Sequence, residues 1–290
     1  MTAFLQYVIS GLATGSAYGI IALGFTLVFK ATNVFNFAHG SLMMLGAFLA
    51  WMVTASWGLA LLPGILVTLV LAALIGVGIQ VVVIRPLMGK PLLTLVMATI
   101  ALSLIVSAVA SIAWGSQQRL FPSKLPDHVL HLGGVRVSTL DLIVMGISLG
   151  CVIVFALFFR FTSLGLQMRA TAEDAEAAAL SGVNSTRVFV TTFAVALVLA
   201  AIGGILLANI QLVSLSLGDV GLLAFPAVVV GGLTSVPGAV VGGIVIGVLE
   251  QLSAGYISVE AQDVIVYAVL LVVLLVRPWG LFGEREIVRV

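Results

Sequence analysis

Charged residues are scarce in this sequence. The 290-residue chain has 12 Lys and Arg and 11 Asp and Glu, so only 8% of its residues are charged, whereas 62% are hydrophobic. Soluble domains carry about a quarter charged residues, and the mean hydropathy of +1.30 lies far outside their range. The composition therefore excludes a soluble globular protein and predicts an integral membrane protein.

Cysteine and clustered metal ligands are also lacking. The single Cys151 lies in an apolar run, which excludes a disulfide framework and favours a role as a small apolar side chain. His39 stands alone, while His128 and His131 share a predicted outer loop without any thiol. We therefore expect no metal site. Nucleophile–base pairs and paired carboxylates in a plausible arrangement are missing too, so we expect no catalytic site.

What the sequence does contain is long apolar runs separated by polar breaks. A helix needs about 20 residues to cross about 30 Å of hydrocarbon, and these runs are continuous blocks rather than alternating strands. They predict an all-α polytopic membrane protein, a bundle of about eight or nine transmembrane helices forming a single domain over residues 1–290. The predicted spans are 4–29, 41–55, 59–84, 92–114, 139–159, 188–211, 220–234, 238–257 and 263–276.

Two of these spans are short, and each follows a polar, glycine-containing break. The span 41–55 follows 33–40, and the span 220–234 follows 214–221, with Pro226 as a further kink. They resemble half-helices or re-entrant segments, so eight or ten crossings remain possible. Backbone groups freed by such breaks are tolerated only inside protein or along a water-filled cavity. We therefore expect both breaks to line a translocation path.

Polar side chains at membrane depth are the candidates for that path. An ionisable side chain there costs at least about 2.5 kcal/mol, so it usually faces a cavity or a partner. His39 can be neutral and satisfied by a backbone carbonyl, and then holds the break in shape rather than touching substrate. Glu250 has either a hydrogen-bonding role near the outer end of its helix or a role in the path. The candidate path residues are Asn33, Asn36, His39, Ser41, Asp219, Phe225 and Glu250.

Lys and Arg in the short loops predict the orientation. With the N-terminus outside and the C-terminus cytoplasmic, loop 115–138 is external and loop 160–187 cytoplasmic. Most basic residues then fall on the cytoplasmic side: Lys30, Arg85, Lys90, Arg160, Arg169, Arg187, Arg277, Arg285 and Arg289. The opposite side keeps Arg119, Lys124 and Arg136.

Glycines recur at four-residue spacing in the first span and near the end of the chain. This spacing places small residues on one helix face, where backbones can approach closely. We expect packing within the chain rather than a dimer seam. The glycines are Gly11, Gly15 and Gly19, then Gly238 and Gly242, and Gly243 and Gly247.

The cytoplasmic loop 160–187 contains an alanine-rich helix pattern. Thr171 is a candidate cap, acids follow it, residues 175–179 favour helix, and Gly182 is a natural stop. A short helix with small residues along one face suits docking into a groove on another protein. A solvated connector is the alternative, and the residues alone do not separate the two.

The loop pattern Gly165-x-x-x-Arg169-Ala-x-Ala-Glu-Asp174 resembles the coupling segment of permease subunits of branched-chain amino acid ABC importers. The resemblance covers nearly the whole chain. Further stretches that resemble the family, in order, are Asn36-Phe-Ala-His39-Gly40, Thr99-Ile-Ala-Leu-Ser103, Val230-Gly-Gly-Leu-Thr-Ser-Val-Pro-Gly238-Ala, and Arg277-Pro278-x-Gly280-Leu.

The resemblance implies partners and a location. Partners are two ATPase subunits, a second homologous or identical permease subunit, and a periplasmic or lipid-anchored substrate-binding protein, with no nucleic acid. The location is the bacterial inner membrane. Contact with the ATPase is implied for Gly165, Arg169, Ala170, Glu173, Asp174, Ala178 and Gly182.

A phosphate-binding Gly-x-x-x-x-Gly-Lys-Ser/Thr motif is missing from the sequence. ATP with Mg²⁺ is therefore expected in the separate ATPase chain, and we expect this chain to bind no cofactor and not to be an enzyme. Alternatives are a permease for urea, short amides or other amino acids, and an ion-coupled secondary transporter. The latter would place clustered acids at mid-membrane, where only Glu250 is available. An intramembrane enzyme lacks the required groups.

Overall fold

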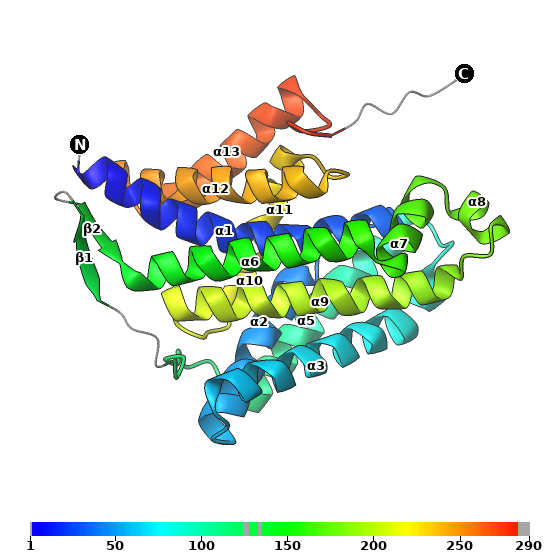
Figure 1. The fold of residues 1–290 in the computed structure, drawn as a ribbon, viewed down its shortest axis with the longest axis horizontal. Coiled ribbons are helices and arrows are strands. Elements are labelled where there is room, and N and C mark those ends of the chain that lie inside the picture. Colours follow the sequence, from blue (N-terminus) through cyan, green and yellow to red (C-terminus); the bar gives the residue numbers. More distant parts are fainter. Residues whose placement is uncertain (1, 124–127, 133–134, 284–290) are drawn as a thin grey trace.

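The computed structural model describes residues 2–123, 128–132 and 135–283, and these form a bundle of helices with one small β-hairpin (Figure 1). The prediction of an all-α polytopic protein is confirmed. The elements are α1 (Thr2–Thr32), α2 (His39–Trp51), the π-helix η1 (Met52–Ser56), α3 (Leu61–Ile79), the π-helix η2 (Gln80–Ile84), α4 (Arg85–Leu87), α5 (Leu92–Trp114), β1 (Val129–Leu132), β2 (Val135–Ser138), α6 (Thr139–Phe161), α7 (Ser163–Glu173), α8 (Ala175–Leu180), α9 (Ser185–Ile210), α10 (Leu217–Leu222), α11 (Ala224–Gly231), α12 (Val236–Tyr256) and α13 (Ala261–Val276).

Long apolar helices dominate the described chain. Seven helices are long and apolar enough to cross a membrane, and two shorter apolar helices, Leu217–Gly231 and Ala261–Val276, complete the set. The shorter pair includes the predicted short span 220–234, which is divided into α10 and α11. The predicted span 59–84 is longer in the structure, because η2 and α4 continue it to Leu87.

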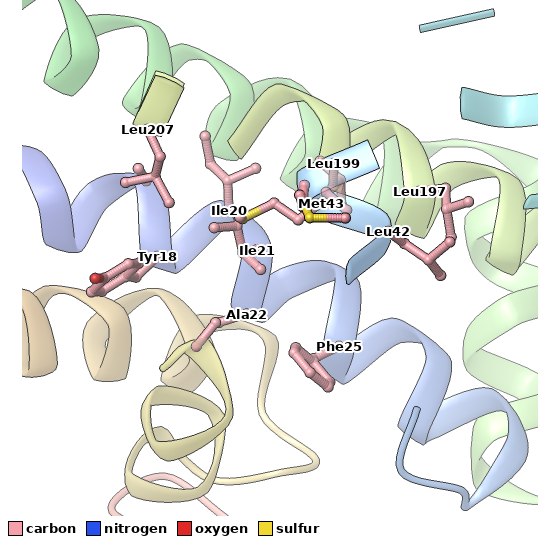
Figure 2. Packing of buried hydrophobic residues seen from close by; sticks show 14 of the residues in the cluster. Tyr18, Ile20, Ile21, Ala22, Phe25, Leu42, Met43, Leu197, Leu199 and Leu207 are labelled. Atoms are coloured by element: carbon pink, nitrogen blue, oxygen red, sulfur yellow. The ribbon is translucent and has the colours of Figure 1, made fainter. Parts of the chain in front are cut away.

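Helix α1 forms the centre of the bundle. Its residues from Ala13 to Val28 are almost all buried, and α12, α9, α6 and α11 pack around it. Figure 2 shows Ile20 on one side of α1 with Met43 of α2 and Leu207 of α9, and Tyr18 and Ala22 on the other. All five side chains are completely buried. A helix buried all round fits its uniformly apolar sequence.

The glycines of α1 and α12 bring these two helices into backbone contact. A Cβ on Gly15 would lie 2.8 Å from the Gly243 carbonyl oxygen, and one on Gly11 would lie 2.7 Å from the Val248 Cα. Similarly, a Cβ on Gly247 would overlap the Gly15 backbone. The prediction of glycine-mediated packing within the chain is confirmed.

The outer helices present apolar side chains outward. Leu62 and Leu66 of α3 are 75% and 65% exposed, and Ile112 of α5 is 87% exposed. In water such a surface would be unfavourable, but lipid chains solvate it. The exposed apolar surface therefore agrees with the multi-pass membrane protein that the composition predicts.

The external loop 115–138 departs from the all-helical prediction. Strands β1 and β2 pair antiparallel within it, and Arg119 pairs with Val213 through two backbone hydrogen bonds of 2.9 Å. This pairing ties the loop to the segment between α9 and α10. Lys124, Arg285 and Arg289, whose sides of the membrane are predicted from the sequence, lie outside the described residues.

The predicted break at 214–221 is wrong in its bounds. Residues 211–216 form the actual interruption, and α10 already begins at Leu217. Sequence reasoning counted Gly218 and Gly221 as breakers, but both lie in α10. The missing side chain of Gly221 lets this helix approach Gly40 of α2.

The two ends of the bundle differ in their elements. The start of α1 and the β1–β2 hairpin lie at one end, and α7 and α8 lie at the other (Figure 1). Lys30 and Arg160 stand in the last turns of α1 and α6, at the α7–α8 end. This basic end is the one that the charge pattern predicts to be cytoplasmic.

Candidate functional site

The first predicted break ends in a fully buried histidine. The chain leaves α1 at Thr32, turns through Asn33 with φ of 53°, and folds back so that α2 begins at His39. His39 Nε2 donates to the Ile21 carbonyl of α1 at 3.2 Å, and its ring packs on Phe25 with a centroid distance of 4.4 Å. The predicted backbone carbonyl partner is therefore present for Nε2, whereas Nδ1 has no hydrogen-bond partner among the described residues.

Glycine makes room for this histidine. A Cβ on Gly24 would lie 2.8 Å from the imidazole of His39. Because His39 is 0% exposed, it fixes the connection between α1 and α2 in place. The geometry favours the shape-holding role over contact with a passing molecule.

The other polar residues of the break have different surroundings. Asn36 Oδ1 accepts from the Ala38 N–H at 3.2 Å, which satisfies part of the freed backbone. The Ser41 and Ser103 hydroxyls hydrogen-bond at 2.7 Å, joining α2 to α5. Asn33 is exposed. The His39 side chain hydrogen-bonds α1 rather than either of these amides.

The two predicted breaks come together in the structure. A Cβ on Gly40 would lie 2.5 Å from the Gly218 carbonyl oxygen, and one on Gly221 would lie 2.7 Å from the Gly40 Cα. The start of α2 therefore packs directly on α10. Two segments far apart in sequence thus form one contiguous region inside the bundle.

An aromatic cluster lies next to this region. It consists of Phe25, Phe35, Phe37 and Phe225; Phe225 lies 5.6 Å from Phe35 and 5.9 Å from Phe37 between ring centroids. Of the four, only Phe225 was among the sequence candidates. The signal that could have indicated the others is the spacing of Phe35 and Phe37 in the break itself, since such rings fill the space that an irregular backbone leaves.

A polar pocket of about 540 Å³ lies beside α10. Its walls are the interruption before α10, α10 itself, α12 and the start of α13. Asp219 and Glu250 of the candidate set both line it. The remaining lining residues are Gln211, Ser216, Val220, Leu222, Leu223, Gln262, Asp263 and Tyr267.

Glu250 is the buried carboxyl of this pocket. It is 3% exposed, and its Oε2 has no hydrogen-bond partner among the described residues. The Tyr18 hydroxyl lies near it but also completes no hydrogen bond within the described chain. Glu250 therefore combines a neighbouring phenol donor, in line with the hydrogen-bonding alternative, with a place in the pocket wall, in line with a role in the path.

At the opposite end, the loop 160–187, which is predicted to be cytoplasmic, forms the two helices α7 and α8 rather than one. Thr162 caps α7 by accepting from the Gly165 N–H at 3.0 Å, and Asp174 caps α8 by accepting from the N–H groups of Glu176 and Ala177 at 2.9 Å. The prediction of Thr171 as the cap is wrong, since Thr171 is buried within α7. An aspartate at the turn between two short helices is the better cap.

The predicted contact residues of this loop divide into inward and outward positions. A Cβ on Gly165 would overlap the Phe159 carbonyl, and Ala178 is 5% exposed, so neither faces outward. Arg169 donates to the Arg160 carbonyl at 3.2 Å, which secures α7 on the end of α6. Glu173 and Asp174 are exposed, Ala170 is half-buried, and Gly182, with φ of 88°, ends the α8 turn.

Sequence reasoning missed one residue on this surface. Leu180, the last residue of α8, is 91% exposed. An apolar residue after an alanine-rich helix, outside every span, was the signal that could have indicated it. Its side chain therefore adds an apolar contact surface at the end of α8.

The chain was compared with known proteins. Residues 7–274 match the family model described as branched-chain amino acid transport system / permease component. The high-affinity branched-chain amino acid transport system permease protein LivH of Salmonella typhimurium is 32% identical, over 99% of this chain and 98% of that protein. BraD of Pseudomonas aeruginosa, with the same description, is 31% identical, also over 99% and 98%.

Among solved structures, PsaBC from Streptococcus pneumoniae in complex with Fab has a TM-score of 0.50. It shares 15% sequence identity and covers 93% of this chain and 90% of that chain. At this identity the similarity shows the fold alone.

Proposed function

Because the chain belongs to the family of permease components of branched-chain amino acid transport systems, we propose that it is the membrane-spanning subunit of an ABC importer for branched-chain or related hydrophobic amino acids. The match over residues 7–274 carries this proposal. The chain is a transport subunit rather than an enzyme. Substrate delivered from outside crosses by alternating access between two orientations of the path.

The proposed assembly contains two permease subunits, two ATPase subunits and an extracytoplasmic binding protein. Membership of the family supports the ATPase and the binding protein as partners. The second permease is homologous or identical. We place the complex in the bacterial inner membrane with the α7–α8 end cytoplasmic, which the basic residues at that end support.

Energy is proposed to enter at the surface formed by α7 and α8. ATP and Mg²⁺ are bound by the ATPase chain, and this chain transmits the movement. Leu180, together with the exposed acids Glu173 and Asp174, meets the ATPase groove. Gly165, Arg169 and Ala178 support this surface by fixing α7 and α8 against α6 and α9. Ala170 and Gly182 shape the same two helices.

The contact with the ATPase can be tested by co-purification. Leu180→Asp should abolish ATPase binding and uptake while the subunit stays inserted, because a charge replaces the apolar tip of α8. Leu130→Asp, an equally apolar position in β1 at the opposite end and 42% exposed, is the matched control and should bind ATPase normally. If Leu180→Asp bound the ATPase at the wild-type level, the proposal that the α7–α8 surface contacts the ATPase would be contradicted.

The proposed path runs from the polar pocket past α10 to the aromatic cluster. Asp219 and Glu250 lie at the pocket, and Phe225 lies at the cluster. Asn36 and His39 hold the connection between α1 and α2 in shape, Ser41 joins α2 to α5, and Asn33 begins the turn. A cysteine at Phe225 should react with small hydrophilic thiol reagents in one nucleotide state and be protected in another. A cysteine there that stays unreactive in every state would exclude this route.

A further inference from the structure

The polar pocket has the chemistry to bind a free amino acid. Asp219, Glu250 and Asp263 supply three carboxyl groups from three different helices, α10, α12 and α13. Val220, Leu222 and Leu223 supply an apolar wall, and Gln211 and Gln262 supply amide donors. The pocket volume of about 540 Å³ lies within the range of about 300–1,000 Å³ of small-molecule sites.

Glu250 is the buried carboxyl that faces this pocket. Its side chain is 3% exposed, it lines the pocket, and its Oε2 has no hydrogen-bond partner among the described residues. A buried carboxyl oxygen without a hydrogen-bond donor is unfavourable, so such groups usually have a partner that completes them. The Tyr18 hydroxyl is one donor near Glu250, and the carboxylate keeps acceptor sites for a second donor that reaches it from the pocket.

The arrangement of the carboxyl groups suits an ammonium group rather than a metal ion. Within the described ranges, no group of three or more His, Cys, Asp or Glu side chains is close enough to hold a metal ion. An ammonium group needs only one carboxylate for a charge-assisted hydrogen bond, and Glu250 provides it, while Asp219 and Asp263 add negative charge at the pocket wall. The apolar wall beside them suits an aliphatic side chain.

We propose that this pocket is a transit site for zwitterionic aliphatic amino acids, in which Glu250 accepts hydrogen bonds from the α-ammonium group and the carboxylates of Asp219 and Asp263 add negative charge that attracts it. The substrate carboxylate meets the amides of Gln211 and Gln262, and the aliphatic side chain lies on Val220, Leu222 and Leu223. This inference rests on the proposed function, and it assigns selection to the permease itself. Urea and short amides lack the ammonium group, so the site disfavours them.

The test uses a cysteine that leaves all three carboxyls in place. Ser216→Cys lies in the pocket wall at an exposed position, in a chain whose native thiol is removed by Cys151→Ala. Its rate of modification by a small thiol reagent is measured in the assembled importer. Four probes are added in turn: leucine, 3-methylbutylamine, 4-methylpentanoate and urea. Of the charged groups of leucine, 3-methylbutylamine keeps only the ammonium group and 4-methylpentanoate keeps only the carboxylate.

Leucine and 3-methylbutylamine should slow modification, whereas 4-methylpentanoate and urea should not. Glu250→Gln should weaken protection by both amines roughly tenfold or more, the size expected for one charge-assisted hydrogen bond. Equal protection by 4-methylpentanoate, or protection that Glu250→Gln leaves unchanged, would overturn the ammonium site.

Two controls match these variants. Glu260→Gln removes an exposed acid just before α13. Hydrogen bonds from the Glu260 backbone N–H and the Ser258 hydroxyl lower the pKa of Glu260, so Glu260 is a charged neighbour outside the pocket. Its replacement should not change the protection of Ser216→Cys. Val259→Cys, exposed in the same loop, should not be protected by any probe. Protection of Val259→Cys equal to that of Ser216→Cys would contradict a local site.

Uptake separates this inference from the proposed function. Protection by 3-methylbutylamine together with no leucine uptake by the assembled importer would support the cation site and contradict the proposed function. Leucine uptake that Glu250→Gln leaves unchanged would support the proposed function and overturn the transit site.

Discussion

At the scale of single residues, the contact between α1 and α12 depends on positions that tolerate no side chain. Gly15→Ala should lower the free energy of unfolding by about 1–3 kcal/mol, because its Cβ would lie 2.8 Å from both the Gly243 carbonyl oxygen and the Ile244 Cα, and backbone must move. The midpoint of heat-induced loss of monodisperse protein in detergent measures this effect.

Gly146→Ala is the matched control. Gly146 lies on α6 with no described atom within 4 Å of an added Cβ. Its replacement should be neutral or stabilising by up to about 1 kcal/mol, since alanine favours helix over glycine. Equal losses at both positions would show that helix propensity rather than interhelical contact governs the two sites.

At the scale of elements, Arg119 joins the external loop to three parts of the bundle. Its guanidinium lies 4.2 Å from the Trp51 ring centroid and donates to the Trp114 carbonyl, while its backbone pairs with Val213. Arg119→Ala should therefore loosen residues 211–216 and speed amide exchange at Val213 roughly tenfold, the loss of about one charged hydrogen bond. Exchange mass spectrometry of this segment measures the change.

Arg136→Ala provides the comparison. Arg136 is exposed on β2 of the same external loop, so its loss removes an equal charge without the contacts to Trp51 and Trp114. Exchange at Val213 should stay at the wild-type rate. An equal acceleration in both variants would indicate an effect of loop charge instead of the Arg119 contacts.

Reasoning from the sequence predicted the helices better than the contacts between them. The span 92–114 coincides with α5, because a long apolar run needs only its own length to be recognised. The cap of α8 was misplaced, because Thr171 and Asp174 are both acceptable caps and only the packing of Thr171 decides between them. The contact of Phe225 with Phe35 was not predictable, because it joins residues far apart in the sequence.

The same difference holds for the candidate site. Asp219 and Glu250 were predicted from their polarity at depth, and the structure places both in one pocket. Asp263 was not among the sequence candidates, because nothing in its local sequence indicates that the start of α13 faces α10. Leu180 was not among them either, because its only signal is a single apolar residue outside the spans, and single exposed leucines are common.

At the scale of the whole molecule, the two ends should be accessible from opposite sides of the membrane. In a chain with Cys151→Ala, a cysteine at Val259 should react with a membrane-impermeant maleimide in cells with a permeable outer membrane. A cysteine at Ser181, exposed just after α8, should react only after the inner membrane is opened. The reverse pattern would invert the proposed orientation.

The central position of α1 also constrains biosynthesis. Helix α1 packs most extensively on α12, and the two are separated by most of the described chain, so α1 is synthesised well before its main partner. Until α12 emerges from the ribosome, Gly11 and Gly15 have no partner, and the native centre of the bundle cannot close. Long-range contacts of this kind slow folding and leave incomplete chains open to wrong pairings. Nascent chains that stop before residue 236 should therefore be substrates for membrane proteases.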